Sequence, residues 1–258
     1  MRLGLCTFSC KLHWEAARKK RAEALFADAP GFYEYARRLG ADGVQTSARE
    51  LTPESARAFR QLVEQTGGYY EGEVRLPKDR SELADFEREV KLAKAAGAEV
   101  ARTVLMGGRR YDVFQTLAEF QKFRDDGIRR LQLAEPVARK HGLKLALENH
   151  KDLLVREQLA VIEHIASEWL GVLVDTGNNI ALCEDPYGVV EALAPHAVSC
   201  HLKDMAVQPS ADGFLLSETP FGHGFLDLDR IVRTLAAANP KLIFHVEMAT
   251  RDPLAIPC

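Results

Sequence analysis

Residues 142–175, with the sequence GLKLALENHKDLLVREQLAVIEHIASEWLGVLVD, contain one strand–helix–strand unit. Two apolar runs, Leu145–Leu147 and Val172–Val174, enclose an amphipathic segment. Strands that are apolar at every position, without polar alternation, are typical of a parallel sheet that is covered on both faces. Each run is followed by an acid, Glu148 in the first case and Asp175 in the second. The unit therefore predicts parallel strands with chemically active side chains at their carboxyl ends.

The same alternation of strands and helices continues along the chain. We predict eight strands, at Leu3–Thr7, Gly43–Thr46, Tyr69–Arg75, Val100–Leu105, Leu143–Asn149, Gly171–Asp175, Val198–Lys203 and Leu242–Glu247. Seven helices are predicted between them, at Gly31–Leu39, Pro53–Thr66, Ser81–Ala96, Val113–His141, Val155–Ser167, Pro186–Ala194 and Leu228–Ala238. This pattern predicts an α/β protein, a (β/α)8 TIM barrel that takes up residues 1–258 as a single domain. A doubly wound open sheet is the alternative, although no glycine-rich phosphate-binding motif follows any predicted strand.

The eighth helix of such a barrel is expected to be missing or truncated. Only 11 residues follow Glu247, and Pro253 and Pro257 lie among them. Proline is unfavourable inside a helix because it lacks the N–H donor. Either the chain is a shortened piece, or a partner covers the outer face of the last strand, which makes a homo-oligomer an open possibility.

Composition excludes several classes of function. The 34 basic and 37 acidic residues leave a net charge of −3, whereas a nucleic-acid-binding domain needs a strongly basic face. No apolar run approaches the roughly 20 residues that span a membrane. The five cysteines include no CxxC pair, which argues against a disulfide framework and against a thiolate zinc site. We therefore expect a cytoplasmic protein whose partner is a small molecule, with neither nucleic acid nor membrane involved.

Four predicted strands in succession end in a side chain that can bind a metal ion. They are Glu148, Asp175, His201 and Glu247. A single acid after an apolar run commonly marks no more than a strand end in solvent, but four in a row are not explained in that way. In a barrel the carboxyl ends of the strands meet at one mouth, so these side chains are expected to converge. Three carboxylates and one imidazole suit Mn²⁺ or Mg²⁺, with Co²⁺ or Zn²⁺ able to compete.

The segments around these residues resemble a known family. Glu148–His150, Asp175–Asn178, His201–Asp204 and Gly222–Asp227 are similar to motifs of the xylose isomerase-like TIM barrel superfamily, in its sugar phosphate isomerase/epimerase branch. That branch includes ketose epimerases, inosose isomerases and inosose dehydratases. The resemblance implies that Glu148, Asp175, His201 and Glu247 bind one divalent ion, and that the two glutamates act as acid and base.

Two departures from the family narrow the expected activity. Asn178 stands where ketose 3-epimerases have a histidine, and Val207 stands where they have an arginine. Both positions handle substrate in those enzymes, so 3-epimerisation of free ketohexoses is not expected. The extra histidines of the apurinic endonuclease branch are also missing, because the third and fourth strands end near Arg75 and Arg102.

Further residues are candidates for the site, each with a simpler alternative. Strand alternation directs Lys203 to the same mouth as His201, where it would donate to a substrate oxygen; a pair with Asp204 is equally open. His150, Asn178 and His223 are expected to bind substrate, whereas a loop or supporting role is the alternative for each. Trp14 and Phe8 would stack on a sugar, although packing in the core or a lid is the default for aromatic residues.

The predicted function is that of a divalent-metal-dependent sugar isomerase or epimerase. It would act on a small polyhydroxylated carbonyl compound through an enediolate, with Glu148, Glu247 and Lys203 as catalytic residues. The first alternative is a metal-dependent dehydratase or β-eliminating lyase that acts on a keto-sugar or inosose. The second is a sugar-binding protein without catalytic activity, against which the two glutamates argue, since a binding protein needs no pair of bases.

Overall fold

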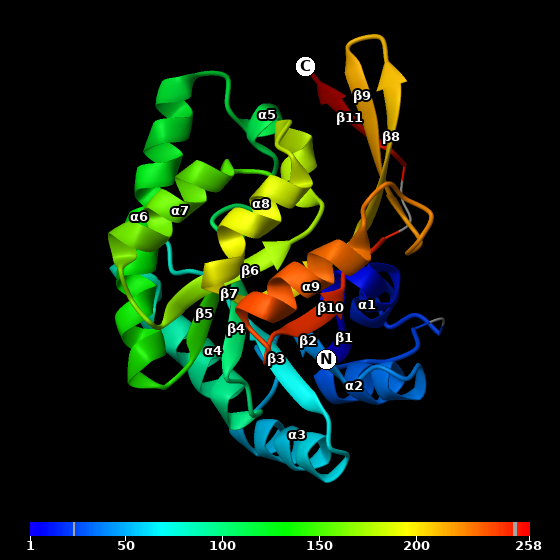
Figure 1. Ribbon diagram of the computed structural model, residues 1–258. Helices are drawn as coiled ribbons and strands as arrows, with labels where there is room; N and C mark the ends of the chain where they lie inside the picture. Colours follow the sequence, from blue (N-terminus) through cyan, green and yellow to red (C-terminus); the bar gives the residue numbers. More distant parts are fainter. Residues whose placement is uncertain (23, 250–251) are drawn as a thin grey trace.

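A computed structural model describes residues 1–22, 24–249 and 252–258 of the chain. Eight parallel strands close into a barrel, in the order β1-β10-β7-β6-β5-β4-β3-β2 (Figure 1). They are β1 (Arg2–Cys6), β2 (Gly43–Thr46), β3 (Tyr69–Glu73), β4 (Val100–Thr103), β5 (Lys144–Glu148), β6 (Leu170–Asp175), β7 (Ala197–Leu202) and β10 (Ile243–Val246). The predicted (β/α)8 TIM barrel is confirmed, and the open sheet is wrong because β1 pairs with both β2 and β10.

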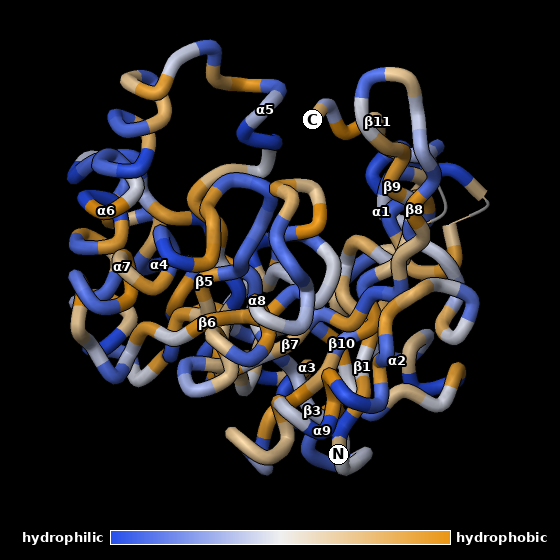
Figure 2. The backbone as a smooth tube through the Cα atoms, turned by 45° about the horizontal axis from the view of Figure 1, so that its top comes forward, coloured by the Kyte–Doolittle hydropathy of each residue, from blue (hydrophilic) through white to orange (hydrophobic). Residues whose placement is uncertain are grey.

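Helices surround the barrel. The α-helices are α1 (Lys11–Arg18), α2 (Ala29–Arg38), α3 (Pro53–Gln65), α4 (Leu83–Ala95), α5 (Arg110–Val113), α6 (Leu117–Lys140), α7 (Val155–Ile165), α8 (Pro186–Leu193) and α9 (Leu228–Ala238). Short 3-10 helices are η1 (Thr7–Cys10), η2 (Arg80–Glu82), η3 (Asn178–Leu182) and η4 (Ala194–His196). Hydrophobic positions dominate β5 and β6, whereas α6 on the outside alternates between hydrophobic and hydrophilic turns (Figure 2). The core therefore lies inside the barrel and between the barrel and its helices.

The structure differs from the helix prediction in two places. The prediction missed α1, whose buried face contains only Trp14 and Ala16. The helix predicted over Val113–His141 begins too early, because α5 ends at Val113 and Thr116 is the N-cap of α6, which starts at Leu117. The Thr116 side chain accepts a hydrogen bond from the N–H of Glu119, whose side chain in turn accepts one from Thr116 N–H. Such a capping box fixes the start of a helix.

The predicted set of strands is incomplete after the seventh barrel strand. The strands β8 (Asp204–Ser210) and β9 (Gly213–Thr219) form an antiparallel hairpin, and the strand β11 (Leu254–Pro257) pairs with β9. This three-stranded sheet stands beside the barrel mouth (Figure 1). Among the described residues no helix follows β10, as the two prolines predict, and none of the described helices is long and apolar enough to cross a membrane.

Candidate metal centre and active site

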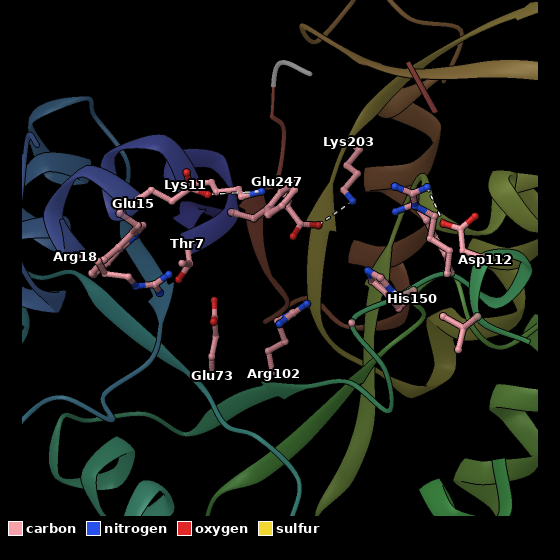
Figure 3. Close-up of a pocket in the computed structure, with 17 residues that line it drawn as sticks. Thr7, Lys11, Glu15, Arg18, Glu73, Arg102, Asp112, His150, Lys203 and Glu247 are labelled. Atoms are coloured by element: carbon pink, nitrogen blue, oxygen red, sulfur yellow. Dashed lines mark hydrogen bonds and ion pairs between the residues drawn. The ribbon is translucent and has the colours of Figure 1, made fainter. Parts of the chain in front are cut away.

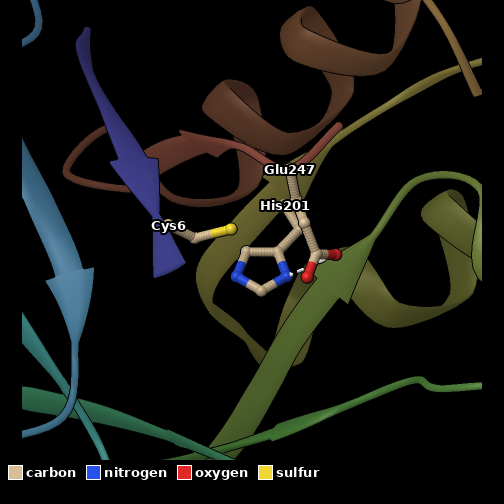
Figure 4. Close-up of side chains that lie close together, drawn as sticks. All are labelled: Cys6, His201 and Glu247. Carbon is tan, nitrogen blue, oxygen red and sulfur yellow. Dashed lines mark ion pairs between the residues drawn. The ribbon is translucent and has the colours of Figure 1, made fainter. Parts of the chain in front are cut away.

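The four predicted metal ligands meet at the mouth of the barrel. Glu148, Asp175, His201 and Glu247 each offer one ligand atom, and these atoms all lie within 4.8 Å of one another. All four residues are buried, with at most 5% of any of them exposed. We call these four residues the ligand cluster. Figure 4 shows the imidazole of His201 facing the carboxylate of Glu247, with Cys6 beside them; His201 Nδ1 lies 3.1 Å from Glu247 Oε2.

The barrel register accounts for this convergence. Asp175 at the end of β6 pairs directly with His201 on β7, and His201 pairs with His245 on β10. Asp175 is also held by its own loop, because its Oδ1 accepts hydrogen bonds of 2.9 Å from the N–H groups of Gly177 and Asn178. Only Oδ2 of this carboxylate is then left to face the cluster.

The orientation of His201 is set from the barrel interior. His201 Nε2 lies 2.7 Å from Gln45 Oε1, and Gln45 Nε2 donates to Glu71 Oε2 at 3.1 Å. Glu71 Oε2 also accepts a hydrogen bond of 2.7 Å from Ser199 Oγ, so the NH₂ group of Gln45 faces this acceptor and the amide oxygen faces His201. Gln45 therefore keeps a proton on His201 Nε2, so Nδ1 is the nitrogen that faces the three carboxylates.

Two cations balance the charge of the cluster. Lys203 Nζ lies 2.9 Å from both Asp175 Oδ2 and Glu247 Oε2. The alternative pairing with Asp204 is wrong, because Asp204 accepts backbone hydrogen bonds from its own loop instead. Arg102 Nε donates to Glu148 Oε2 at 2.5 Å, and Asn178 Nδ2 donates to Glu148 Oε1 at 3.0 Å. Both oxygens of Glu148 are thus already engaged.

The carboxylate charges follow from these contacts. Burial opposes ionisation of Glu148, but the Arg102 guanidinium outweighs it and holds the pKa of Glu148 below its usual range. Burial acts in the same way on Glu247, where His201 and Lys203 hold the pKa well below its usual range. Burial raises the pKa of Asp175 to about 6, despite the opposing Lys203. The two glutamates are therefore ionised at neutral pH.

The cluster fits a divalent metal ion. Asp175 Oδ2, His201 Nδ1 and Glu247 Oε2 are buried and make no hydrogen bond with the described residues, apart from the ion pairs already given. These are the atoms that a metal ion would need. A second group of possible ligands, Cys6 with His201 and Glu247, fits less well, since burial raises the pKa of the Cys6 thiol and keeps it protonated. The three carboxylates and one imidazole therefore remain the better set, and they suit hard divalent ions.

A cavity of about 600 Å³ opens above the cluster. Figure 3 shows Glu247, Lys203, His150 and Arg102 around it, with Arg18 and Thr7 on the side of α1 and β1. Trp14 and Phe8 also line it. Such a volume is typical of a small-molecule site.

The three predicted substrate-binding residues lie in different positions relative to the cavity. His150 lines the cavity, where its Nδ1 lies 3.2 Å from the carbonyl of Gly108 and burial lowers its pKa to about 4. Asn178 is buried beneath the cavity, and its Oδ1 accepts from Lys203 Nζ at 3.2 Å and from Lys151. His223 is exposed, and it is not among the residues that line the cavity.

Sequence reasoning missed several residues that support the site. Arg102 was mentioned only because the apurinic endonuclease branch has a histidine near that strand end. Gln45 and Lys151 were not identified as candidates. A signal existed for Gln45, which is a polar residue within the buried strand GVQT. It becomes interpretable only when the closed barrel places β2 opposite β7.

Comparison with known proteins identifies the family. The profile described as xylose isomerase-like TIM barrel matches residues 33–256. The chain belongs to the xylose isomerase-like TIM barrel family. Solved structures with a similar fold include D-psicose 3-epimerase, determined in the presence of D-fructose, at 14% identity and a TM-score of 0.70 over 98% of this chain and 87% of that one. Another is a xylose isomerase-like TIM barrel protein from Mycobacterium smegmatis in complex with magnesium, at 21% identity and a TM-score of 0.64, over 85% and 81% of the two chains.

One relative, similar to part of this chain, has a named activity. A segment of 113 residues is 34% identical to 3-oxo-isoapionate decarboxylase from Pectobacterium atrosepticum. The segment covers 43% of this chain and 41% of that relative, so the match spans less than half of either protein. The structural similarities, all at low identity, establish the fold that these xylose isomerase-like proteins share.

Proposed function

We propose that this xylose isomerase-like protein is a divalent-metal-dependent sugar isomerase or epimerase. It acts on a small polyhydroxylated carbonyl compound through an enediolate. The observation that carries the proposal is the position of Glu247, which belongs to the ligand cluster and also lines the cavity. In this proposal one carboxylate both holds a metal ion and reaches a substrate carbon.

The residues divide the chemistry between them. Glu247 removes the proton from the carbon next to the substrate carbonyl and returns it to the neighbouring carbon. Lys203, 2.9 Å from Glu247, donates to the substrate oxygen on which negative charge develops. A bound divalent ion, Mn²⁺ or Mg²⁺ first and Co²⁺ or Zn²⁺ next, would supply further positive charge for that oxygen. His150 lies at the cavity wall, where it contacts a substrate hydroxyl.

The contacts of Glu148 favour isomerisation within this pair of reactions. Isomerisation moves one proton between neighbouring carbons and needs one base, whereas epimerisation needs a second base on the opposite face. Glu148 is the second base that the family resemblance implies, but Arg102 and Asn178 hold its two oxygens. Epimerisation therefore requires Arg102 to release Glu148.

Solvent-exchange NMR tests the proposal. Protein reconstituted with Mn²⁺ is incubated in deuterated water with ketoses, inososes and 3-keto-glycosides, and the metal is removed before spectra are recorded. We expect deuterium in the recovered sugar. An unsaturated product that absorbs in the ultraviolet would indicate a lyase, and no exchange with any compound would indicate a sugar-binding protein.

A substitution assigns the base. Glu247→Gln is expected to lower exchange at least 100-fold and to retain part of the bound metal, because the amide oxygen still coordinates but cannot take up the proton. Elemental analysis after dialysis measures the metal. Glu163→Gln, exposed on α7, is the matched control. Full exchange in Glu247→Gln would remove Glu247 from the role of base.

Decarboxylation of a 3-oxo acid is the second candidate. Loss of CO₂ from such an acid breaks the bond to the carboxylate and leaves an enolate, so it needs charge stabilisation and a proton donor but no base. Two observations favour it: the engaged state of Glu148, and the cations Arg102, Lys151 and Lys203 that line the cavity. The partial similarity to 3-oxo-isoapionate decarboxylase supports it as well. Release of ¹³CO₂ from a carboxyl-labelled 3-oxo sugar acid distinguishes this reaction from isomerisation.

A further inference from the structure

The cavity above the ligand cluster continues into a second lobe. A neighbouring hollow of about 510 Å³ shares six lining residues with it: Thr7, Trp14, Arg18, Glu73, Arg102 and Gly107. The remaining lining residues follow β2, β3 and β4 or lie on the helices behind them. Because five arginines line it (Arg18, Arg49, Arg75, Arg102 and Arg130), we call it the arginine lobe.

The positive charge of the arginine lobe is only partly compensated. The guanidinium group of Arg49 is paired with Glu89, because its Nε and Nη2 donate to Glu89 Oε1 at 2.9 and 2.6 Å. Arg102 is occupied by Glu148. Arg18 and Arg75, in contrast, make no side-chain hydrogen bond or ion pair with any residue that the structure describes. Two guanidinium groups therefore remain available to a ligand.

Arg130 adds a positive charge to the lobe, and its hydrogen-bond partners are uncharged. Arg130 donates to the backbone carbonyls of Leu76, Pro77 and Leu105, so its guanidinium is fixed in place by neutral groups. Besides Glu89, the acids that line the lobe are Glu73 and the exposed Glu50, so two carboxylates stand against the three guanidinium groups of Arg18, Arg75 and Arg130. Figure 3 shows the Glu73 carboxyl group between Arg18 and Arg102, where the two parts of the cavity join.

We propose that the arginine lobe binds the anionic end of the substrate, a phosphate or a carboxylate, while the carbonyl end lies at the ligand cluster. The proposal rests on the proposed function and adds the substrate class, an extended sugar with a terminal oxyanion. Guanidinium groups match the geometry of phosphate and carboxylate oxygens through paired N–H donors. A neutral sugar leaves Arg18 and Arg75 without a partner, so it gains nothing from this part of the cavity.

Calorimetric titration with unreactive ligands of equal chain length tests the arginine lobe. The probes are ribitol, ribitol 5-phosphate and ribonate, each added to protein saturated with Mg²⁺. We expect one of the two anions to bind at least tenfold more tightly than ribitol, and the anion that does so identifies the terminal group. Equal affinity for all three probes would overturn the proposal.

Substitutions separate the arginine lobe from the metal ion, which also attracts anions. Arg75→Gln and Arg18→Gln are expected to remove most of the tenfold advantage without a change in metal affinity. Arg57→Gln, exposed on α3 outside this cavity, is expected to keep the advantage. If the advantage persists in both lobe variants, the anion binds elsewhere and the inference is wrong.

The two proposals fail in different ways. Solvent exchange with neutral sugars, together with equal binding of all three probes, would leave the isomerase proposal intact and remove the arginine lobe. Tighter binding of an anion that depends on Arg75, together with no solvent exchange on any compound, would leave the arginine lobe intact and remove the isomerase proposal.

Discussion

A single amide decides which nitrogen of His201 faces the ligand cluster. If the side chain of Gln45 were turned over, its NH₂ group would face Nε2 of His201 and the imidazole proton would move to Nδ1. Glu71 prevents this, because its Oε2 accepts from Gln45 Nε2 and from Ser199 Oγ at 2.7 Å. Side chains behind a metal ligand commonly change metal affinity 10- to 100-fold when they are lost.

At this scale we predict that Gln45→Leu weakens metal binding by about 10- to 100-fold. Leucine has a similar volume but cannot hold the proton of His201 on Nε2. Calorimetric titration with Mn²⁺ measures the affinity, and the ¹⁵N shifts of the imidazole report which nitrogen is protonated. Gln61→Leu, exposed on α3, serves as the control. An unchanged affinity, or an unchanged ¹⁵N pattern, would contradict this account of His201.

Among the elements, the β8–β9 hairpin depends on one buried carboxylate at its base. Asp204 Oδ2 accepts from the N–H groups of Gly222 and Gly224, and Oδ1 accepts from that of Met205. At Gly224 there is no room for a side chain, because an added Cβ would fall within 2.4 Å of the Met205 carbonyl oxygen. The returning loop, which contains His223, is thus tied to the first residue of β8, directly after Lys203.

We expect Asp204→Asn to loosen this loop and to lower the free energy of unfolding by about 1–3 kcal/mol. The amide group of asparagine has one acceptor atom in place of two and introduces donors that face backbone N–H groups. Hydrogen exchange at Gly222 and Gly224 is expected to become faster, and urea denaturation gives the loss of stability. Asp212→Asn, exposed in the turn of the same hairpin, is the control. Protection that remains at both glycines would show that the carboxylate is not the anchor.

The molecule as a whole buries several acids near the barrel mouth, and this makes its stability depend on pH. Burial raises the pKa of Asp152 to about 7 and that of Glu71 to about 7. Between their ordinary pKa values near 4 and these raised values, the unfolded chain binds fewer protons than the folded one. The contribution of such a group to stability is therefore full in acid and is lost as the pH rises through that window.

Asp152→Asn is predicted to stabilise the protein more at pH 8 than at pH 4. The variant and the unsubstituted protein differ in their free energy of unfolding, and this difference grows by at most about 1.4 kcal/mol for each pH unit between about 4 and 7. Asparagine stays neutral, and its oxygen can still accept the hydrogen bond from Leu153 N–H. Urea denaturation of both proteins at several pH values measures this difference. A difference that does not change with pH would show that Asp152 is ionised in the folded protein throughout.

The barrel and the ligand cluster were predictable because their signals are local. Apolar runs that end in an acid or a histidine locate Glu148, Asp175, His201 and Glu247 within their own strands. Strand alternation also predicted Lys203 at the same mouth as His201, and its Nζ lies 2.9 Å from Asp175 and Glu247 there. Each of these inferences needs only a few neighbouring residues, and the closure rule for eight strands adds the rest.

The hairpin and its third strand were not predicted, although part of their signal was present. Asp212-Gly213 is a typical turn between antiparallel strands, but the polar residues of β8 obscured it. The pairing of β11 with β9 joins segments that are about 40 residues apart, and nothing within either segment encodes it. The exposed position of His223 follows from the same insertion, so the sequence alone could not place it.

The sequence by itself determined the repeating units, the order of the strands and the four side chains at their ends, since periodicity and strand alternation are properties of short segments. Only the tertiary structure decided that Arg102 engages Glu148, that Gln45 orients His201 and that Lys203 joins Asp175 to Glu247. These contacts connect residues 28 to 156 positions apart in the sequence. Their energies depend on distance and burial, which exist only after the barrel has closed.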